Sequence, residues 1–258
     1  MWPRSIIRWL ALAAMPLSGP ACALAQPAPR PATQQLRWVA WMGDHPINTR
    51  WSLHFDAGWR QVLGSAWDQW LARPGLNFHP RRNVTLSAAY SYFDTHPDGL
   101  LSDAGQTPEH RLQEQFEASH RAGNLTVVHR SRIDHRWLGG IRAEPLPRHW
   151  NLQHRLRQLA RVNIPLKQLP SGRLLYLGLY DEIFLRYGYS GVSHFEQNRI
   201  YAGIGIRPFK GNTSVEAGAF HQRFLPLVGG GVQNNFVFLV TITNRTPLRN
   251  LLRRSASD

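Results

Sequence analysis

The chain of 258 residues has a single cysteine, Cys22, which lies near the N-terminus. One cysteine forms no internal disulfide, and Cys22 falls in a segment that we expect to be removed. Thiol catalysis and a disulfide scaffold are therefore excluded for the mature chain.

Beyond the N-terminal segment, the sequence lacks an apolar run of the roughly 20 residues that a transmembrane helix needs. The segment itself has Arg4 and Arg8, then an apolar stretch at 9–17, then the small residues Ala23 and Ala25. This order is typical of a secretory signal peptide. We therefore expect a cleaved signal peptide at 1–25 and no helical membrane span in the mature chain.

Lysine and the acidic residues are scarce. Lys167 and Lys210 are the only lysines among 30 basic residues, against 16 Asp and Glu, and the formal net charge is +14. This excess of arginine predicts affinity for anions, such as lipopolysaccharide phosphates or small acidic solutes. Nucleic acid is not an expected partner, because the arginines are spread along the chain and form no known binding motif.

What the sequence does have is long period-two alternation. In 173–187, Leu177 and Leu179 share one face, while Tyr180 and Glu182 share the opposite one. An apolar face backed by a polar one is what a transmembrane barrel strand needs, with lipid outside and a polar lumen inside. The mean hydropathy of -0.36 agrees with this, because only alternate residues of a barrel meet lipid.

The alternation becomes clear at Trp51, which shares a face with Trp59. Eight residues of strand span about 26 Å. On a tilted strand this distance covers most of the apolar band, which is about 25 Å tall in outer-membrane barrels. Each ring is therefore predicted to lie in one of the two interfacial aromatic girdles.

The connections between the predicted strands sort into two kinds. Tight turns at 79–83, 121–124, 169–172 and 210–213 alternate with longer loops at 61–69, 93–107, 138–147, 188–194 and 225–234. Such alternation is expected when one rim is periplasmic and the other extracellular. The fold is predicted to be all-β, a single antiparallel transmembrane β-barrel of about 10 strands, or 12 if Leu36–Met42 enters the wall with a further strand.

The predicted organisation has four parts. The signal peptide at 1–25 precedes a Pro- and Gln-rich spacer at 26–35, expected to be disordered. The barrel occupies 36–245, and a basic tail follows at 246–258. The location predicted from these parts is the outer membrane of a Gram-negative bacterium.

A family resemblance is carried by the arginine-rich hairpin and by four further stretches: EHRLQEQF (109–116), YDEIFLRYG (180–188), FEQNRIYAGIGIRPF (195–209) and VEAGAFHQRF (215–224). Together they resemble the bacterial outer-membrane family catalogued as domain of unknown function 2490, over roughly 36–243. The resemblance implies an outer-membrane β-barrel and brings no assigned activity or catalytic residue.

Charged side chains recur on the inward faces of the predicted strands. We expect a lumen charge cluster of Arg130, Arg132, Asp134, Arg136, Arg155, Arg157, Arg161, Glu182, Arg199, Arg207 and Glu216. Either these residues form a structural network of charge pairs, or they line a narrow, porin-like path for anions, since rings of arginine favour anions. Arginines outnumber carboxylates in the cluster, which argues for an anionic ligand or counter-ion.

Two other functions stay open. The first is a closed structural barrel whose loops contact lipopolysaccharide or another cell surface. The second is a hydrolase at the rim, where histidine could act as a general base. Candidate groups for it are Asp94, His96, Asp98, Asp103, His110, His135, Ser193 and His194, but no recognisable catalytic spacing relates them.

No cofactor is expected, and no metal, because no pair of His, Asp or Glu residues shows ligand spacing with a second pair. Gly203 and Gly205 lie inside a predicted strand, where they would leave room for large lumen side chains and not bind phosphate. The expected partners are outer-membrane lipid and lipopolysaccharide, the barrel-insertion machinery during biogenesis, and small anions.

Overall fold

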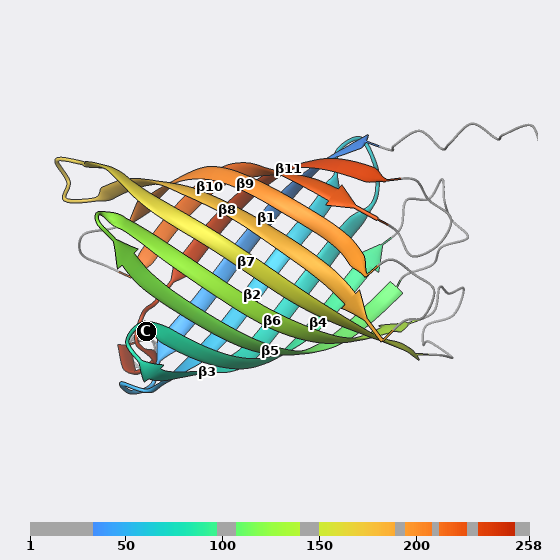
Figure 1. Cartoon of the computed structure of the whole chain (residues 1–258), viewed down its shortest axis with the longest axis horizontal. Coiled ribbons are helices and arrows are strands. Elements are labelled where there is room, and N and C mark those ends of the chain that lie inside the picture. Colours follow the sequence, from blue (N-terminus) through green and yellow to red (C-terminus); the bar gives the residue numbers. More distant parts are fainter. Residues whose placement is uncertain are drawn as a thin grey trace, which may run out of the picture.

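The computed structural model describes residues 33–96, 107–139, 150–188, 194–207, 212–225 and 232–250. Eleven strands form one closed barrel, tilted strongly against its long axis (Figure 1). In chain order they are β1 (Thr33–Pro46), β2 (Trp51–Val62), β3 (Asp68–Arg81), β4 (Val84–His96), β5 (Thr107–Ala122), β6 (Leu125–Gly139), β7 (Trp150–Gln168), β8 (Leu174–Tyr187), β9 (Phe195–Arg207), β10 (Thr213–Phe224) and β11 (Gln233–Asn244). The all-β barrel is confirmed.

The expected count of 10 or 12 strands is wrong by one. Leu36–Met42 does enter the wall, as the centre of β1, and it needs no further strand as a partner. β1 pairs antiparallel with β2 and parallel with β11. An odd number of strands closes a meander in this way, because its first and last strands run in the same direction.

The residues outside the described ranges include the predicted signal peptide and most of the longer loops. β1 begins at Thr33, inside the stretch 26–35 expected to be a spacer. At the other end of the barrel, the segment after β11 returns to β1, where the backbone oxygen of Thr246 lies 2.9 Å from Nδ1 of His45.

The two rims differ in the length of their connections. Between the strand bounds, one rim has connections at 47–50, 82–83, 123–124, 169–173 and 208–212, and we call it the short-connection rim. The other, the long-connection rim, has 63–67, 97–106, 140–149, 188–194 and 225–232. Gly123 and Gly172, with φ of 63° and 75°, occupy the left-handed region that the turns at the short-connection rim require.

Polar and apolar side chains are distributed in reverse of a water-soluble protein. The exposed large hydrophobic residues include Ile200, Ile204 and Phe238, at 59%, 54% and 48% exposure, whereas Asp134 is fully buried. Among the buried residues, polar and charged side chains outnumber hydrophobic ones. The strand alternation thus directs apolar side chains outward and polar ones into the lumen, as predicted.

On the outer face, one pair of aromatic side chains lies next to each rim. Trp51 and Phe78 lie with ring centroids 4.8 Å apart next to the short-connection rim. Trp59 and Trp70 lie 6.0 Å apart next to the long-connection rim. The described residues contain no helix with the length and apolar character needed to cross a membrane.

Candidate functional site

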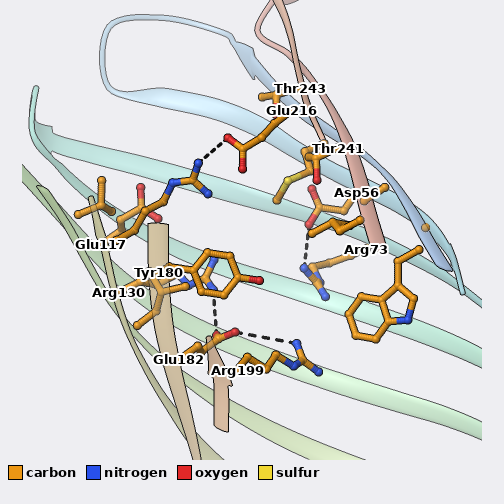
Figure 2. Close-up of a pocket in the computed structure, with 18 of the residues that line it drawn as sticks. Asp56, Arg73, Glu117, Arg130, Tyr180, Glu182, Arg199, Glu216, Thr241 and Thr243 are labelled. Atoms are coloured by element: carbon orange, nitrogen blue, oxygen red, sulfur yellow. Dashed lines mark hydrogen bonds and ion pairs between the residues drawn. The ribbon is translucent and has the colours of Figure 1, made fainter. Parts of the chain in front are cut away.

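The lumen is the candidate functional site, and Glu182 on β8 is the centre of its best-defined cluster. Arg157 and Arg130 donate hydrogen bonds of 2.7 and 2.9 Å to Oε1 of Glu182. Arg199 reaches Oε2 from β9 at 3.9 Å, and Figure 2 shows Arg130 and Arg199 meeting Glu182 from different strands. Three guanidinium groups therefore share one carboxylate. Arg157 and Glu182 are both buried.

A second cluster lies closer to the long-connection rim. Arg155 donates to Asp134 Oδ2 at 2.6 and 2.9 Å and to Glu196 Oε1 at 3.1 Å. Beside it, Arg136 donates to Glu109 at 2.5 Å. These groups are buried or nearly so, and burial strengthens each ion pair while making an unpaired charge expensive.

A third cluster surrounds Glu216 on β10, toward the short-connection rim. Arg161 donates to it at 2.5 Å, and the hydroxyls of Tyr176 and Tyr201 each donate at 2.7 Å. The two tyrosine rings lie over Gly205 and Gly203, where an added Cβ would overlap them. The prediction that these glycines make room for large lumen side chains is confirmed.

Phenylalanine rings alternate with guanidinium groups across the middle of the lumen. Phe93, Phe184 and Phe220 are at most 1% exposed. The guanidinium carbon of Arg111 lies 3.6 Å from the centroid of Phe93, and that of Arg157 lies 4.5 Å from the centroid of Phe184. We call this set the aromatic–arginine layer. Such contacts stabilise a cation with a ring quadrupole in place of a carboxylate.

Some lumen arginines have no carboxylate partner in the described part of the chain. Arg60 donates to Gln69 at 2.7 Å, and its guanidinium carbon lies 4.1 Å from the centroid of Trp38. Arg132 donates to Gln115 at 2.9 Å. Their positive charges are therefore met by neutral oxygens and a ring, and not by a carboxylate of the described residues.

A cavity of about 630 Å³ extends from this layer to the short-connection rim, where Asn212, Thr243 and Arg245 line it. Eleven arginines line the cavity, against four carboxylates. The arginines are Arg60, Arg73, Arg111, Arg130, Arg132, Arg155, Arg157, Arg161, Arg199, Arg207 and Arg245, and the carboxylates are Asp56, Glu117, Glu182 and Glu216. The cavity is strongly positive.

Two residues that line this cavity have a buried nitrogen donor with no hydrogen-bond partner among the described residues: Trp38 at Nε1 and Arg199 at Nε. The guanidinium carbon of Arg199 lies 5.0 Å from the Trp38 centroid, on a ring that Arg60 also contacts. A buried donor without an acceptor is costly, so an acceptor bound between these groups would stabilise the lumen. Oδ1 of Asp56 and Oε2 of Glu196 are the corresponding buried acceptors without partners.

The structure brings the sequence-derived cluster together in the lumen. Nine of its eleven members line the cavity, and Asp134 and Arg136 pair with Arg155 and Glu109 farther up the barrel. The cluster omitted further lumen residues, chiefly Trp38, Asp56, Arg60, Arg73, Glu109, Arg111, Glu117, Tyr176, Tyr180, Phe184 and Glu196. Most of these lie on the polar face of an alternating strand, which is the signal that could have found them.

The rim residues weighed as catalytic groups do not form a catalytic arrangement within the described residues. His96 contacts Asp68 at 2.9 Å, and His110 contacts Tyr90 at 2.5 Å. His135 and His154 contact each other at 2.9 Å. Asp98, Asp103 and Ser193 lie outside the described residues.

One Ser–His–Asp group does occur, near the short-connection rim. Ser52 Oγ lies 3.0 Å from His79 Nε2 and donates to Asp44, while His79 Nδ1 lies 3.1 Å from Thr85. In a catalytic triad the acid orients the histidine, whereas Asp44 here binds the serine. Ser52 is also 1% exposed, so this group is structural. In the described ranges, no three His, Cys, Asp or Glu side chains are grouped to hold a metal ion.

Comparisons with known proteins identify a family and nothing more. A family model described as "Protein of unknown function (DUF2490)" matches residues 36–226. No curated protein and no solved structure matches the chain.

Proposed function

Because the chain belongs to the DUF2490 family of proteins of unknown function, we propose a function from its lumen: an outer-membrane barrel that binds an anion. The anion enters from the short-connection rim and is held by arginines in the middle of the barrel. The expected ligand is a small phosphate or carboxylate group, which either lipopolysaccharide or a small acidic solute could supply.

The outward apolar face supports the membrane location. Ile200, Ile204 and Phe238 are about half exposed, and Trp51 and Trp59 lie toward opposite rims on the same strand. In water this much exposed apolar surface would drive aggregation, whereas in lipid it is the expected outer face of a barrel flanked by aromatic girdles. The predicted signal peptide agrees with export to this location.

The single observation that carries the binding proposal is the charge of the cavity. Eleven arginines face four carboxylates in it, and Arg60 and Arg132 form no ion pair within the described residues. The positive charges gathered in one cavity repel one another, and burial weakens the screening that water would provide. A bound anion offsets this repulsion, and the donors of Trp38 and Arg199 supply hydrogen bonds to it.

The aromatic–arginine layer favours binding over conduction. Phe93, Phe184 and Phe220 are at most 1% exposed, and Gln113 and Asp134 beyond them are at most 3% exposed. A water-filled path along the lumen would leave its lining exposed. We therefore expect the anion to enter, bind and leave by the same rim.

The test is calorimetric titration of the refolded full chain with inorganic phosphate at constant ionic strength. Folding is checked beforehand by the heat-dependent gel shift. We expect saturable binding that Arg60→Met and Arg199→Met each weaken by roughly 10- to 150-fold, since a charge-assisted hydrogen bond contributes about 1.5–3 kcal/mol. Arg37→Met is the matched control, because Arg37 is exposed on the outer face and donates to Gln61.

Equal phosphate binding by all three variants, or none by the wild-type barrel, would refute the lumenal site. Planar-bilayer recording adds a second readout. Silence is expected from a closed lumen, and discrete anion-selective steps would replace the binding proposal with a pore.

A further inference from the structure

Polar side chains interrupt the outward apolar face on four neighbouring strands. The residues are Glu114 on β5, Ser131 on β6, Gln158 on β7 and Asp181 on β8. Glu114, Gln158 and Asp181 are exposed on the outer face, and the hydrogen bond between Ser131 and Gln158 is exposed as well. We call these four residues the outer polar belt.

The belt lies at the middle of the wall. Each of its residues is within one position of the midpoint of its strand. At the midpoints of the other seven strands, the outward residues are apolar or aromatic: Val39, Ala57, Pro74, Tyr90, Ile200 with Ala202, Ala219 and Phe238. At the strand midpoints, the outward polar positions are therefore confined to β5, β6, β7 and β8.

Such positions are unfavourable against lipid. The hydrocarbon region offers no water to hydrogen-bond, and carboxylates and amides there need protein partners. The belt meets part of this need internally: Ser131 donates to Gln158 Oε1 at 2.8 Å, and Asn198 donates to Asp181. In the described part of the chain, no hydrogen bond uses the NH₂ group of Gln158, which keeps two donors for a partner.

We propose that this face is where a second copy of the chain docks in the membrane. The proposal takes from the proposed function only the membrane location, and not the anion. Two copies in one membrane share their orientation, so a two-fold axis along the membrane normal brings residues of equal depth together. Gln158 then meets its own equivalent, and the two carboxamides donate to and accept from each other.

The width of the belt fits this contact. Ser131 and Gln158 occupy the adjacent strands β6 and β7, which are directly paired. Two barrels of equal diameter touch along one or two strands, because their walls curve away on both sides. Glu114 and Asp181, on the outer strands β5 and β8, then line the grooves that flank the contact.

Cysteine cross-linking in phospholipid vesicles tests the docking face. Single cysteines are introduced as Gln158→Cys or Ser131→Cys into the full chain carrying Cys22→Ala. Phe238→Cys on β11 and Ala57→Cys on β2 are matched controls at strand midpoints on the apolar face. Oxidation is expected to trap dimers at 158 and 131 and not at 238 or 57, because a disulfide needs Cα atoms about 4.4–6.8 Å apart.

A second measurement does not depend on an introduced cysteine. Gln158→Leu is expected to weaken dimerisation by roughly five- to tenfold, since the two hydrogen bonds between the Gln158 carboxamides are lost. Dimerisation is measured by sedimentation in detergent. Its heat-dependent gel shift should stay that of a folded barrel. Monomers at every concentration, equal trapping at 158 and 238, or cross-links only to a different protein would each overturn the proposal.

These outcomes are separable from those of the proposed function. A barrel that binds phosphate but stays monomeric loses the dimer and keeps the anion. A dimer without phosphate binding does the reverse. Failure of the chain to partition into vesicles would refute the membrane location on which the dimer depends.

Discussion

Arg60 on β2 and Arg199 on β9 contact the same indole ring, with guanidinium carbons 4.1 and 5.0 Å from the centroid of Trp38. Two cations that share one ring repel each other, and the Nε atom of Arg199 has no acceptor in the described residues. The same three side chains face the cavity. An anion bound there, as proposed above, would offset this repulsion and give Nε of Arg199 an acceptor.

Arg60 is therefore predicted to matter for binding and not for stability. Arg60→Met removes one of several like charges and breaks a single hydrogen bond, to Gln69. We expect the free energy of unfolding to stay unchanged or to rise, measured by urea titration of the barrel without phosphate. A loss of several kcal/mol would instead mean that Arg60 is a structural residue.

Arg155 is predicted to behave in the opposite way. It donates to Asp134, which is 0% exposed, and to Glu196. Arg155→Met leaves a buried carboxylate without its main partner, so the free energy of unfolding should fall by about 3–5 kcal/mol. The double variant Arg155→Met with Asp134→Asn should recover part of this loss, because the unpaired charge is removed. Equal stability of the two variants would contradict the pairing.

Gly205 is predicted to be intolerant of a side chain. A Cβ at this position would overlap the ring of Tyr176, whose hydroxyl donates to Glu216. Gly205→Ala should lower the free energy of unfolding by about 1–3 kcal/mol, as overpacking does. Gly123→Asn is the control: Gly123 has a φ of 63° with open space around it, and asparagine tolerates that conformation.

The sequence pattern predicted the strands and their two faces well, because an apolar outer face and a polar lumen impose a period of two. The pattern could not reveal how the barrel closes. Parallel and antiparallel strands alternate with the same period, so nothing in Leu36–Met42 indicates that β1 pairs with β11 in parallel. The even strand count was wrong for this reason.

The site could be predicted only strand by strand. Alternation directs Arg130 and Glu182 inward, but they meet across 52 residues of sequence, and the stagger of three strands decides that contact. On β5, Glu114 lies on the outward face between Leu112 and Phe116, and this interruption of the apolar face weakens the signal for the inward Glu109 and Arg111. The outer polar belt explains that irregularity.

Phe238 distinguishes a membrane barrel from a soluble one. It is 48% exposed on β11, so in water Phe238→Arg should change the free energy of unfolding by no more than about 0.5 kcal/mol. At the midplane of a bilayer, the same substitution should cost about 2–4 kcal/mol. Urea unfolding in phospholipid vesicles measures the difference. Leu63→Arg is the control, because Leu63 is 40% exposed but lies in the connection 63–67 at the rim, where an arginine costs about 0–1 kcal/mol. Equal and small losses at the two positions would argue that water, and not lipid, surrounds this barrel.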